Sequence, residues 1–283
     1  MCPVHISTTL FKSGPGSPAW ITVTEQGIRQ SFDMTRVMFS RGNITEKIRF
    51  GKLVQRGDIV LDLYGGIGYF TLPALVHGEA DYVYACEWNP EAAKALRFNL
   101  SDNGVDERAT VLEGDCRVQA RKHKLVNMFD RVSLGLLPSS EGGWWTAVQA
   151  LRRSTGGWLH IHGNVPAKEM IIWTEWLCRR LFAMTKELDP PPTDEWSVIC
   201  THVEKVKSFA PTVNHYAADV FIGQPEDIGH DSSVGRGSIG IVDSAGKAAM
   251  SDLTTPLVIP SCALSKDGVL HQDWMLNEAS ELG

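Results

Sequence analysis

A glycine-rich turn preceded by an acidic residue is the feature of this sequence that most directly indicates chemistry. The run Asp62-Leu-Tyr-Gly-Gly-Ile-Gly-Tyr-Phe follows the apolar residues 59–61 and leads into a helical pattern. Glycines let the backbone approach a bound molecule without a Cβ clash, and the start of a helix offers unpaired N–H groups. We therefore take as candidate ligand-binding residues Asp62, Gly65, Gly66 and Gly68.

Three classes of ligand use such a turn, and local sequence separates them. A phosphate-binding P-loop requires Gly-Lys-Ser/Thr, which this turn lacks. A dinucleotide fingerprint requires GxGxxG, but the third glycine position, counted from Gly66 and Gly68, is Thr71. The remaining candidate is an adenosine-type molecule with a sulfonium and an amino acid tail, S-adenosylmethionine.

Two further carboxylates favour that ligand. Glu87, 25 residues beyond Asp62, is predicted to end the second strand, where an acid can accept hydrogen bonds from ribose hydroxyls. Asp115 is predicted to end the third strand, where a carboxylate can reach an adenine amine. Each acid alone could equally be a surface carboxylate. All of them together, in order at successive strand ends, indicate an S-adenosylmethionine site.

The loop after the fourth predicted strand is expected to face the group that is alkylated. Methyltransferases acting on base nitrogens usually place Asn or Asp there, followed by Pro-Pro and an aromatic residue. Here no amide or carboxylate side chain occurs through the candidate substrate loop, which consists of Leu134, Gly135, Leu136, Leu137, Pro138, Ser139 and Ser140. This argues against ordinary N-methylation and favours a carbon nucleophile or a group other than methyl. Trp144 and Trp145, which follow, could stack on a base or be core residues.

The elements around these residues alternate between strands and helices. Strands are predicted at residues 59–63, 82–86, 110–112, 131–134, 158–161, 197–203 and 216–222, and helices at 70–75, 90–103, 144–151 and 168–185. The helix at 90–103 has Asn89 as a cap, Pro90 at its first position and Gly104 at its exit. This alternation predicts an α/β fold with a mostly parallel, seven-stranded sheet and helices on both faces.

Composition and charge limit the remaining possibilities. Of the 283 residues 43% are hydrophobic, yet no uninterrupted apolar run is long enough for a membrane helix and the N-terminus does not resemble a signal peptide. The six scattered cysteines indicate reduced thiols in a cytoplasmic protein without a metal site. Residues 224–283 account for the whole net charge of −6. Basic residues gather at 30–57 and 117–124, where they could contact phosphate or merely solvate a face.

The sequence resembles the wybutosine-pathway tRNA aminocarboxypropyltransferases, which are related to the tRNA guanine-N1 methyltransferases. The similarity covers roughly residues 20–222, and its most discriminating block is the Leu-Gly-Leu-Leu-Pro-Ser-Ser loop. The other matching blocks begin at Met38, Asp62, Cys86, Gly114, Leu159 and Val206.

The resemblance implies a Rossmann-like class I S-adenosylmethionine-dependent transferase. Such an enzyme moves the 3-amino-3-carboxypropyl group to carbon 7 of the 4-demethylwyosine base, 3′ of the anticodon in phenylalanine tRNA, and releases methylthioadenosine. The family's cofactor-binding positions match Ser40, Lys47, Glu87, Asp115 and Cys116. Cys116 replaces the usual Asn, and Gly65 replaces the usual Ala.

Several points stay open at this level. Lys47 could bind the methionine carboxylate or form a salt bridge with Glu46 or Asp62. His160 and His162 are expected to end the fifth strand, but neither is assigned as a general base. A guanine-N1 methyltransferase and a non-catalytic cofactor-binding or tRNA-binding remnant are the alternatives. We expect a transferase domain at residues 31–223, with a lead-in at 1–30 that could be the remnant of an upstream domain and an acidic, poorly ordered tail at 224–283.

Overall fold

The computed structural model describes residues 18–192, 194–228, 239–242, 248–250 and 260–263. The chain divides into two compact units. Unit 1 contains the chain up to residue 135 together with residues 149–152 and 157–160, and unit 2 contains residues 136–148, 153–156 and the chain from 161 onward. Residues 1–17 of the predicted lead-in at 1–30 and most of the predicted tail at 224–283 lie outside the described residues.

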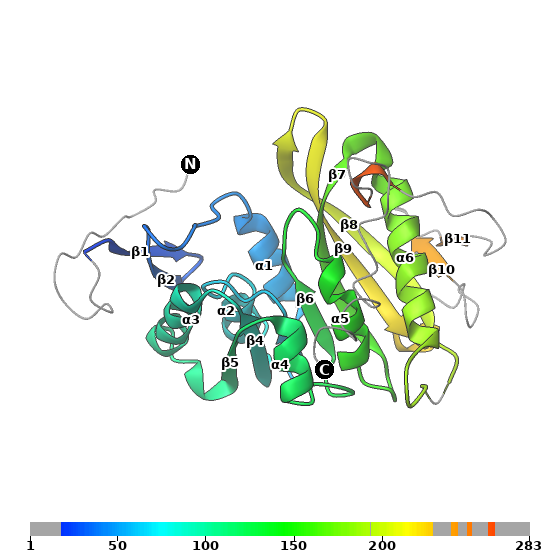
Figure 1. Ribbon diagram of the computed structural model, residues 1–283, viewed down its shortest axis with the longest axis horizontal. Coiled ribbons are helices and arrows are strands. Elements are labelled where there is room, and N and C mark those ends of the chain that lie inside the picture. The colour runs from blue at the N-terminus through cyan, green and yellow to red at the C-terminus, as the bar shows by residue number, and fades with distance from the viewer. Residues whose placement is uncertain (1–17, 193, 229–238, 243–247, 251–259, 264–283) are drawn as a thin grey trace, which may run out of the picture. The chain divides into compact units, whose positions relative to one another are not determined.

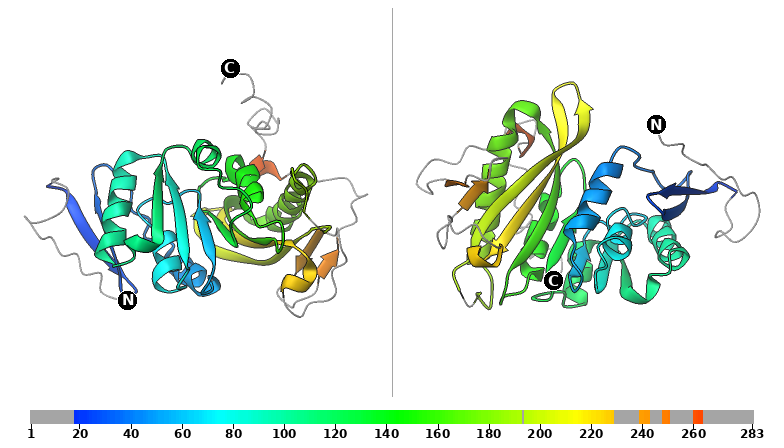
Figure 2. Two further views of the ribbon diagram at one scale, coloured as in Figure 1. Left: turned by 90° about the horizontal axis from the view of Figure 1, so that it is seen from below. Right: turned by 180° about the vertical axis from the view of Figure 1, so that it is seen from behind.

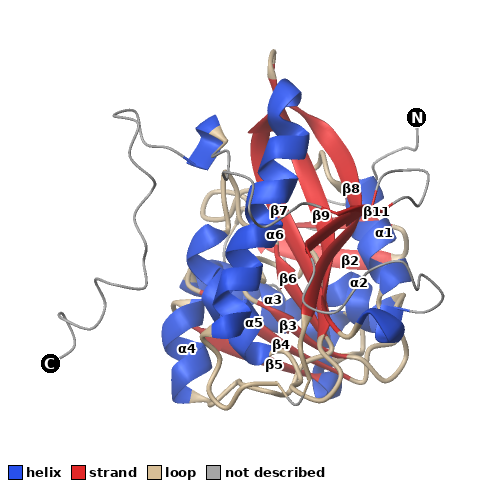
Figure 3. Ribbon diagram, turned by 90° about the vertical axis from the view of Figure 1, so that its right-hand side faces the viewer, coloured by secondary structure: helices blue, strands red, loops and turns tan. Residues whose placement is uncertain are grey.

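Unit 1 is built on parallel strands in the order β6-β3-β4-β5 (Figures 1 and 3). Val60 and Leu61 of the central strand β3 are buried, as expected for side chains on the two faces of a sheet that is covered on both sides. The bounds of these strands are β3 Ile59–Asp62, β4 Tyr82–Glu87, β5 Ala109–Glu113 and β6 Arg131–Leu134. The helices of unit 1 are α1 Ile44–Leu53, α2 Thr71–Val76, α3 Pro90–Asp102 and α4 Cys116–Lys122. An antiparallel hairpin of β1 Trp20–Glu25 and β2 Ile28–Asp33 packs on α3.

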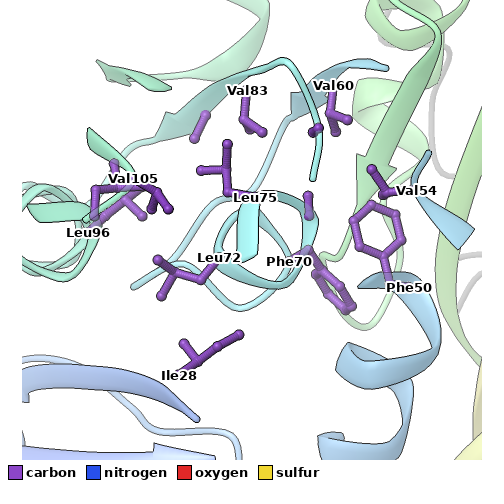
Figure 4. Close-up of a cluster of buried hydrophobic side chains, with 14 residues drawn as sticks. Ile28, Phe50, Val54, Val60, Phe70, Leu72, Leu75, Val83, Leu96 and Val105 are labelled. Carbon is purple, nitrogen blue, oxygen red and sulfur yellow. The ribbon is translucent and has the colours of Figure 1, made fainter. Parts of the chain in front are cut away.

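The main core of unit 1 lies around helix α2 (Figure 4). Leu72 and Leu75 of α2 are buried with Val83 of β4, while Phe50 of α1 meets Phe70 edge to face at 5.3 Å between ring centroids. This packing fixes the helix that follows the glycine turn. The start of the next helix, α3, is fixed by Asn89, whose side chain accepts a hydrogen bond from the Glu91 N–H, as the sequence predicts.

Unit 2 contains a long antiparallel ribbon of β8 Ser197–Ala210 and β9 Val213–Gly223 (Figure 2). Strand β10 Ile239–Val242 pairs parallel with β8, and β11 Ala248–Met250 pairs antiparallel with β10. Helix α6 Met170–Lys186 packs on β8. Two elements, α5 Trp144–Ala150 and β7 Gly157–Pro166, have residues in both units.

The seven predicted strands correspond to β3 through β9, which confirms the α/β class with a mostly parallel sheet flanked by helices. The four predicted helices correspond to α2, α3, α5 and α6, whereas α1, α4 and the β1–β2 hairpin were not predicted. Among the described residues, no helix is both long and apolar enough to span a membrane. The described cysteines are all free thiols.

Two placements in the sequence-based prediction are wrong. His160 and His162 lie inside β7, which continues to Pro166, and do not end the strand. Asp115 does not end the third strand, because β5 stops at Glu113 and Gly114 leaves the extended conformation with a φ of +132°. Asp115 is instead the N-cap of α4, so its carboxylate serves the start of a helix.

Candidate functional site

The glycine turn in unit 1 is hydrogen-bonded to the end of strand β4. The Gly65 N–H donates to the Cys86 carbonyl at 2.8 Å, and the Gly66 N–H donates to Glu87 Oε2 at 2.7 Å. Gly68 has a φ of +106°, and a Cβ there would lie 2.7 Å from Leu72 Cδ1. The turn therefore requires glycine at this point, and its backbone is held against the strand that carries the predicted ribose-binding acid.

Glu87 is the last residue of β4 and is buried. Its second oxygen, Oε1, accepts a hydrogen bond from the Asn89 N–H at 2.8 Å. Burial raises the pKa of Glu87, and the backbone hydrogen bonds oppose that shift. Since a carboxylate can accept about four hydrogen bonds, Glu87 can hold the turn and still accept from ligand hydroxyls.

Asp62 is the last residue of β3, directly before the turn segment, and is completely buried. Its carboxylate accepts hydrogen bonds from Thr71 Oγ1 at 2.7 Å and from the Tyr64 N–H at 3.3 Å. Burial raises the pKa of Asp62 to about 6, although these hydrogen bonds act in the opposite direction. Asp62 thus links the end of β3 to the first turn of α2, which fixes both ends of the glycine segment.

Asp115 and Cys116 begin helix α4 in different environments. The Asp115 carboxylate accepts hydrogen bonds from the Arg117 backbone N–H at 2.8 Å and from its Nη2 at 2.6 Å. Arg117 therefore lowers the pKa of Asp115. Cys116 is buried, and burial raises the pKa of its thiol to about 11 even though Tyr64 hydrogen-bonds to it. The thiol is protonated at neutral pH and is a weak donor where the family usually has an amide.

Ser40 and Lys47 meet around Tyr69, which belongs to the glycine-turn segment. The Tyr69 hydroxyl accepts from the Ser40 N–H at 3.2 Å and donates to the Met38 carbonyl at 2.7 Å. The Lys47 ammonium lies 4.9 Å from the Tyr69 ring centroid. It donates to Glu25 Oε2 at 2.6 Å, so the salt bridge with Glu46 or Asp62 that we considered from the sequence is wrong. Burial lowers the pKa of Lys47, and Glu25 opposes that shift.

The candidate substrate loop begins in unit 1 and continues in unit 2. Leu134 ends β6 and is buried, and a Cβ on Gly135 would lie 2.9 Å from Phe70 Cε2. In unit 2, Ser139 forms an antiparallel bridge with Gly163 of β7. The remaining loop residues include the exposed Leu136, then Leu137, Pro138 and Ser140. Ser140 Oγ accepts a hydrogen bond at 3.3 Å from Nε1 of the buried Trp144, so that indole is a core side chain.

A buried histidine and glutamate form a pair in unit 1 that sequence reasoning missed. His160 Nε2 lies 2.8 Å from Glu46 Oε1, and both side chains are 1% exposed. Burial works to raise the pKa of Glu46, but hydrogen bonds from His160 and Arg49 outweigh it, and the pKa is lowered. The residues are far apart in sequence, so the only sequence signal was a polar residue at an otherwise apolar strand position.

Most of the predicted basic cluster at residues 30–57 is engaged in ion pairs within unit 1. Each pair has a nitrogen–oxygen distance of 2.6–2.9 Å, and the pairs are Arg36–Glu91, Lys47–Glu25, Arg49–Glu46 and Arg56–Glu79. In the second cluster, Arg117 pairs with Asp115 at 2.6 Å. The clusters therefore carry less unbalanced positive charge than the sequence indicates.

Comparison with known proteins identifies the family of this chain. The model of the TRM5/TYW2 methyltransferase domain matches residues 21–189. An Arabidopsis thaliana tRNA wybutosine-synthesizing protein 2/3/4 is 47% identical over 205 residues, which are 72% of this chain and 20% of the relative. A Danio rerio tRNA wybutosine-synthesizing protein 2 homolog is 42% identical in an alignment 238 residues long that covers 72% of this chain and 56% of the relative. The chain thus spans from about a fifth to just over half of the length of these relatives.

Solved structures show the same relationship. The crystal structure of Methanocaldococcus jannaschii Trm5 shares the fold, with a TM-score of 0.57 over 73% of this chain and 57% of that one, at 22% identity. The structure of M. jannaschii TYW2 in complex with AdoMet has a TM-score of 0.64 and 26% identity, covering 78% of this chain and 93% of that one. The family expected from the sequence motifs is therefore confirmed, and the chain belongs to the TRM5/TYW2 methyltransferase domain family.

Proposed function

We propose that this chain transfers the 3-amino-3-carboxypropyl group of S-adenosylmethionine to carbon 7 of 4-demethylwyosine in phenylalanine tRNA, and releases methylthioadenosine. The observation that most supports a nucleoside donor is the hydrogen bond between the Gly66 N–H and Glu87 at 2.7 Å. This hydrogen bond brings a glycine backbone, which a ligand can approach closely, next to a carboxylate that can accept further hydrogen bonds. A ribose needs both, because its hydroxyls donate to a carboxylate at close range. The relatives named above and the TYW2 structure solved with AdoMet support the same donor.

In this proposal the donor lies over the glycine turn of unit 1. Glu87 accepts from the ribose hydroxyls, and Asp115 accepts from the adenine amine. Gly66 and Gly68 allow the turn to pack tightly, because a Cβ on either would lie within 3 Å of the Tyr69 or Leu72 side chain. The proposed contacts to the donor also include Ser40, Lys47, Gly65 and Cys116. Asp62 contributes indirectly, because its hydrogen bonds to Thr71 and Tyr64 hold the turn in place. The donor supplies the sulfonium-bound carbon that is attacked.

The choice of transferred group is supported by the loop of residues 134–140. It offers no side-chain amide or carboxylate to hold a base nitrogen, so a carbon nucleophile positioned by shape is the better fit. The carbon 7–carbon bond forms as the sulfonium–carbon bond breaks, and the proton of carbon 7 leaves afterwards. We assign no general base to that step.

We also propose that residues 31–223 form the transferase domain, with residues 1–30 and 224–283 appended to it. Strands β3–β9 all lie within residues 31–223, which supports the C-terminal boundary, and the family match over residues 21–189 overlaps most of the range. Residues 20–30 pack on this domain, since the Arg29 N–H donates to Asn103 Oδ1 at 3.0 Å and Arg29 Nε donates to Asp102 Oδ2 at 2.8 Å.

The test is to incubate the protein with hypomodified phenylalanine tRNA and S-adenosylmethionine labelled either on its carboxyl carbon or on its methyl carbon. The proposal expects label in tRNA from the carboxyl carbon alone, with release of methylthioadenosine. Label from the methyl alone would identify a guanine-N1 methyltransferase. Label from neither, with S-adenosylmethionine bound, would identify a non-catalytic remnant. Either of these results would refute the proposed reaction.

A further inference from the structure

The turn end of the β8–β9 ribbon in unit 2 is an accessible surface (Figure 2). Strand β10 pairs with β8 only at residues 198–200, so among the described residues the outer edge of β8 beyond them has no partner strand. The turn is held beside the end of β7, because the Ala167 N–H donates to the Thr212 carbonyl at 2.9 Å. The ribbon end, defined as residues 205–213 with Lys168, therefore combines a fixed backbone with exposed side chains.

Phe209 is the exposed aromatic side chain of the ribbon end. It is 61% exposed, and within the described part of the chain its ring has no aromatic or cationic partner. It lies at a shift of the β8–β9 register, between Ser208 and Ala210, so no residue of β9 is paired with it. A bulge of this kind breaks the alternation of a strand and redirects a side chain. The Phe209 ring is thus available to a molecule outside the chain.

Three lysines belong to the same ribbon end. Lys205 and Lys207 precede Phe209 in β8, and Lys168 follows Ala167, which is hydrogen-bonded to the turn. Lys205 and Lys168 are exposed, and Lys207 is half-buried. In the ranges that the structure describes, none of the three ammonium groups forms an ion pair. The ribbon end therefore differs from the basic cluster of unit 1, where most of the positive charges are paired.

The carboxylates next to these lysines in sequence have other partners. Glu204 Oε2 lies 3.1 Å from His202 Nε2, and the Glu169 carboxylate accepts a hydrogen bond from the Ser261 N–H at 2.8 Å. Residues 205–213 themselves contain no acidic side chain. The ammonium groups of the ribbon end are therefore available to an external anion, which they attract through water.

An exposed ring beside unpaired ammonium groups is suited to single-stranded nucleic acid. Lysines attract phosphates, and an aromatic ring stacks on an unpaired base whatever its identity. A base inside a duplex is already stacked on both sides, so an aromatic side chain reaches bases in loops and single strands. An acidic protein segment could pair with the lysines, but an unpaired nucleotide matches both features, because its base and phosphate belong to one strand.

We propose that the ribbon end binds an unpaired stretch of the tRNA, with Phe209 stacked on one base and the lysines in contact with phosphates. The inference rests on the proposed function, which supplies the identity of the RNA. It adds an RNA-binding surface in unit 2 to the donor-binding residues of unit 1.

The test measures the Kd of the full chain for hypomodified phenylalanine tRNA by fluorescence anisotropy over a series of salt concentrations. Replacing both lysines of β8, in Lys205→Gln/Lys207→Gln, should weaken binding and reduce the slope of log Kd against log salt by about 1.4, because each phosphate contact to a single strand contributes about 0.7. Phe209→Ala should raise Kd by about 5- to 140-fold, the equivalent of one stacked base, and leave the slope unchanged. Phe209→Tyr keeps the ring and should retain the wild-type Kd.

Lys186→Gln is the matched control, because Lys186 lies at the opposite end of helix α6 and is paired with Glu195 at 3.1 Å. It should change neither Kd nor slope. All variants should keep the wild-type Tm and the calorimetric Kd for S-adenosylmethionine, since the substituted side chains lie outside the core; a lower Tm together with weaker tRNA binding would assign them a structural role and overturn the proposal.

A single-stranded RNA should compete with the tRNA better than the same sequence in a duplex, and stronger competition by the duplex would overturn the stacking role. Wild-type Kd and slope in both the lysine and the Phe209→Ala variants would overturn the RNA surface and leave an acidic protein segment as its partner. Binding of tRNA through the ribbon end without any transfer of carboxyl label would instead refute the proposed reaction and leave the RNA surface standing.

Discussion

Replacement of Asp62 by Asn should change how the stability of this protein depends on pH. Asp62 is completely buried at the end of β3, and its pKa is raised from 3.8 to about 6. The folded state therefore binds this proton more tightly than the unfolded state does. The resulting stabilisation is complete below about pH 3.8 and is lost as the pH rises through about 6. Across that window the loss amounts to about 3 kcal/mol, of which about 2 kcal/mol falls between pH 4.5 and pH 7.5.

An Asn at this position cannot ionise, yet it keeps an oxygen that can accept from Thr71 or from the Tyr64 N–H. The free energy of unfolding of Asp62→Asn minus that of wild type, both measured by urea titration, should therefore rise by about 2 kcal/mol between pH 4.5 and pH 7.5. The comparison uses the change with pH, because any fixed cost of the substitution cancels. Asp115→Asn is the control and should be flat over this range, since Arg117 lowers the pKa of Asp115 below 3.8. Parallel curves for wild type and Asp62→Asn would refute the argument that burial controls this carboxyl.

Three further predictions concern the same unit. Gly68→Ala should lower the free energy of unfolding by about 1–3 kcal/mol, measured in urea, because the new Cβ meets the Leu72 side chain in a left-handed backbone; no loss would mean that the turn relaxes freely. Lys47→Met should lower the free energy of unfolding by about 3–5 kcal/mol, because it leaves the Glu25 carboxylate without its ammonium partner, and adding Glu25→Gln should recover much of that loss. A double variant as unstable as Lys47→Met would contradict a coupled pair. Glu87→Gln should raise the calorimetric Kd for S-adenosylmethionine by about 10–100-fold, since an amide nitrogen cannot accept from ribose hydroxyls; an unchanged Kd would remove Glu87 from the donor site.

The elements predicted correctly from the sequence are those with strong local signals. Strand β3 is an apolar run stopped by an acid and glycines, and α3 has Asn89 and Pro90 at its start. Helix α1 was missed because it is amphipathic without a side-chain cap, and Asn43 at its start makes no cap hydrogen bond. Helix α4 was missed because the basic residues in it were interpreted only as charge.

The candidate donor site was predictable in composition but not in detail. The glycine turn and Glu87 follow from strand ends that meet at one edge of a parallel sheet, which is a consequence of topology. The partner of Lys47 was not predictable, because Glu25 lies in the β1–β2 hairpin, 22 positions earlier in the sequence. The pairing of His160 with Glu46 is equally non-local, since it joins β7 to α1.

The sequence by itself determined the α/β class, the order of the strands along the chain and the residue types of the glycine turn, because each of these depends on local periodicity and backbone freedom. Which charged groups neutralise one another and how deeply Asp62 and Cys116 are buried were decided only by the tertiary structure. These properties depend on distances between segments that are far apart in the chain, and the energies of charges and hydrogen bonds change steeply with such distances and with exclusion of water.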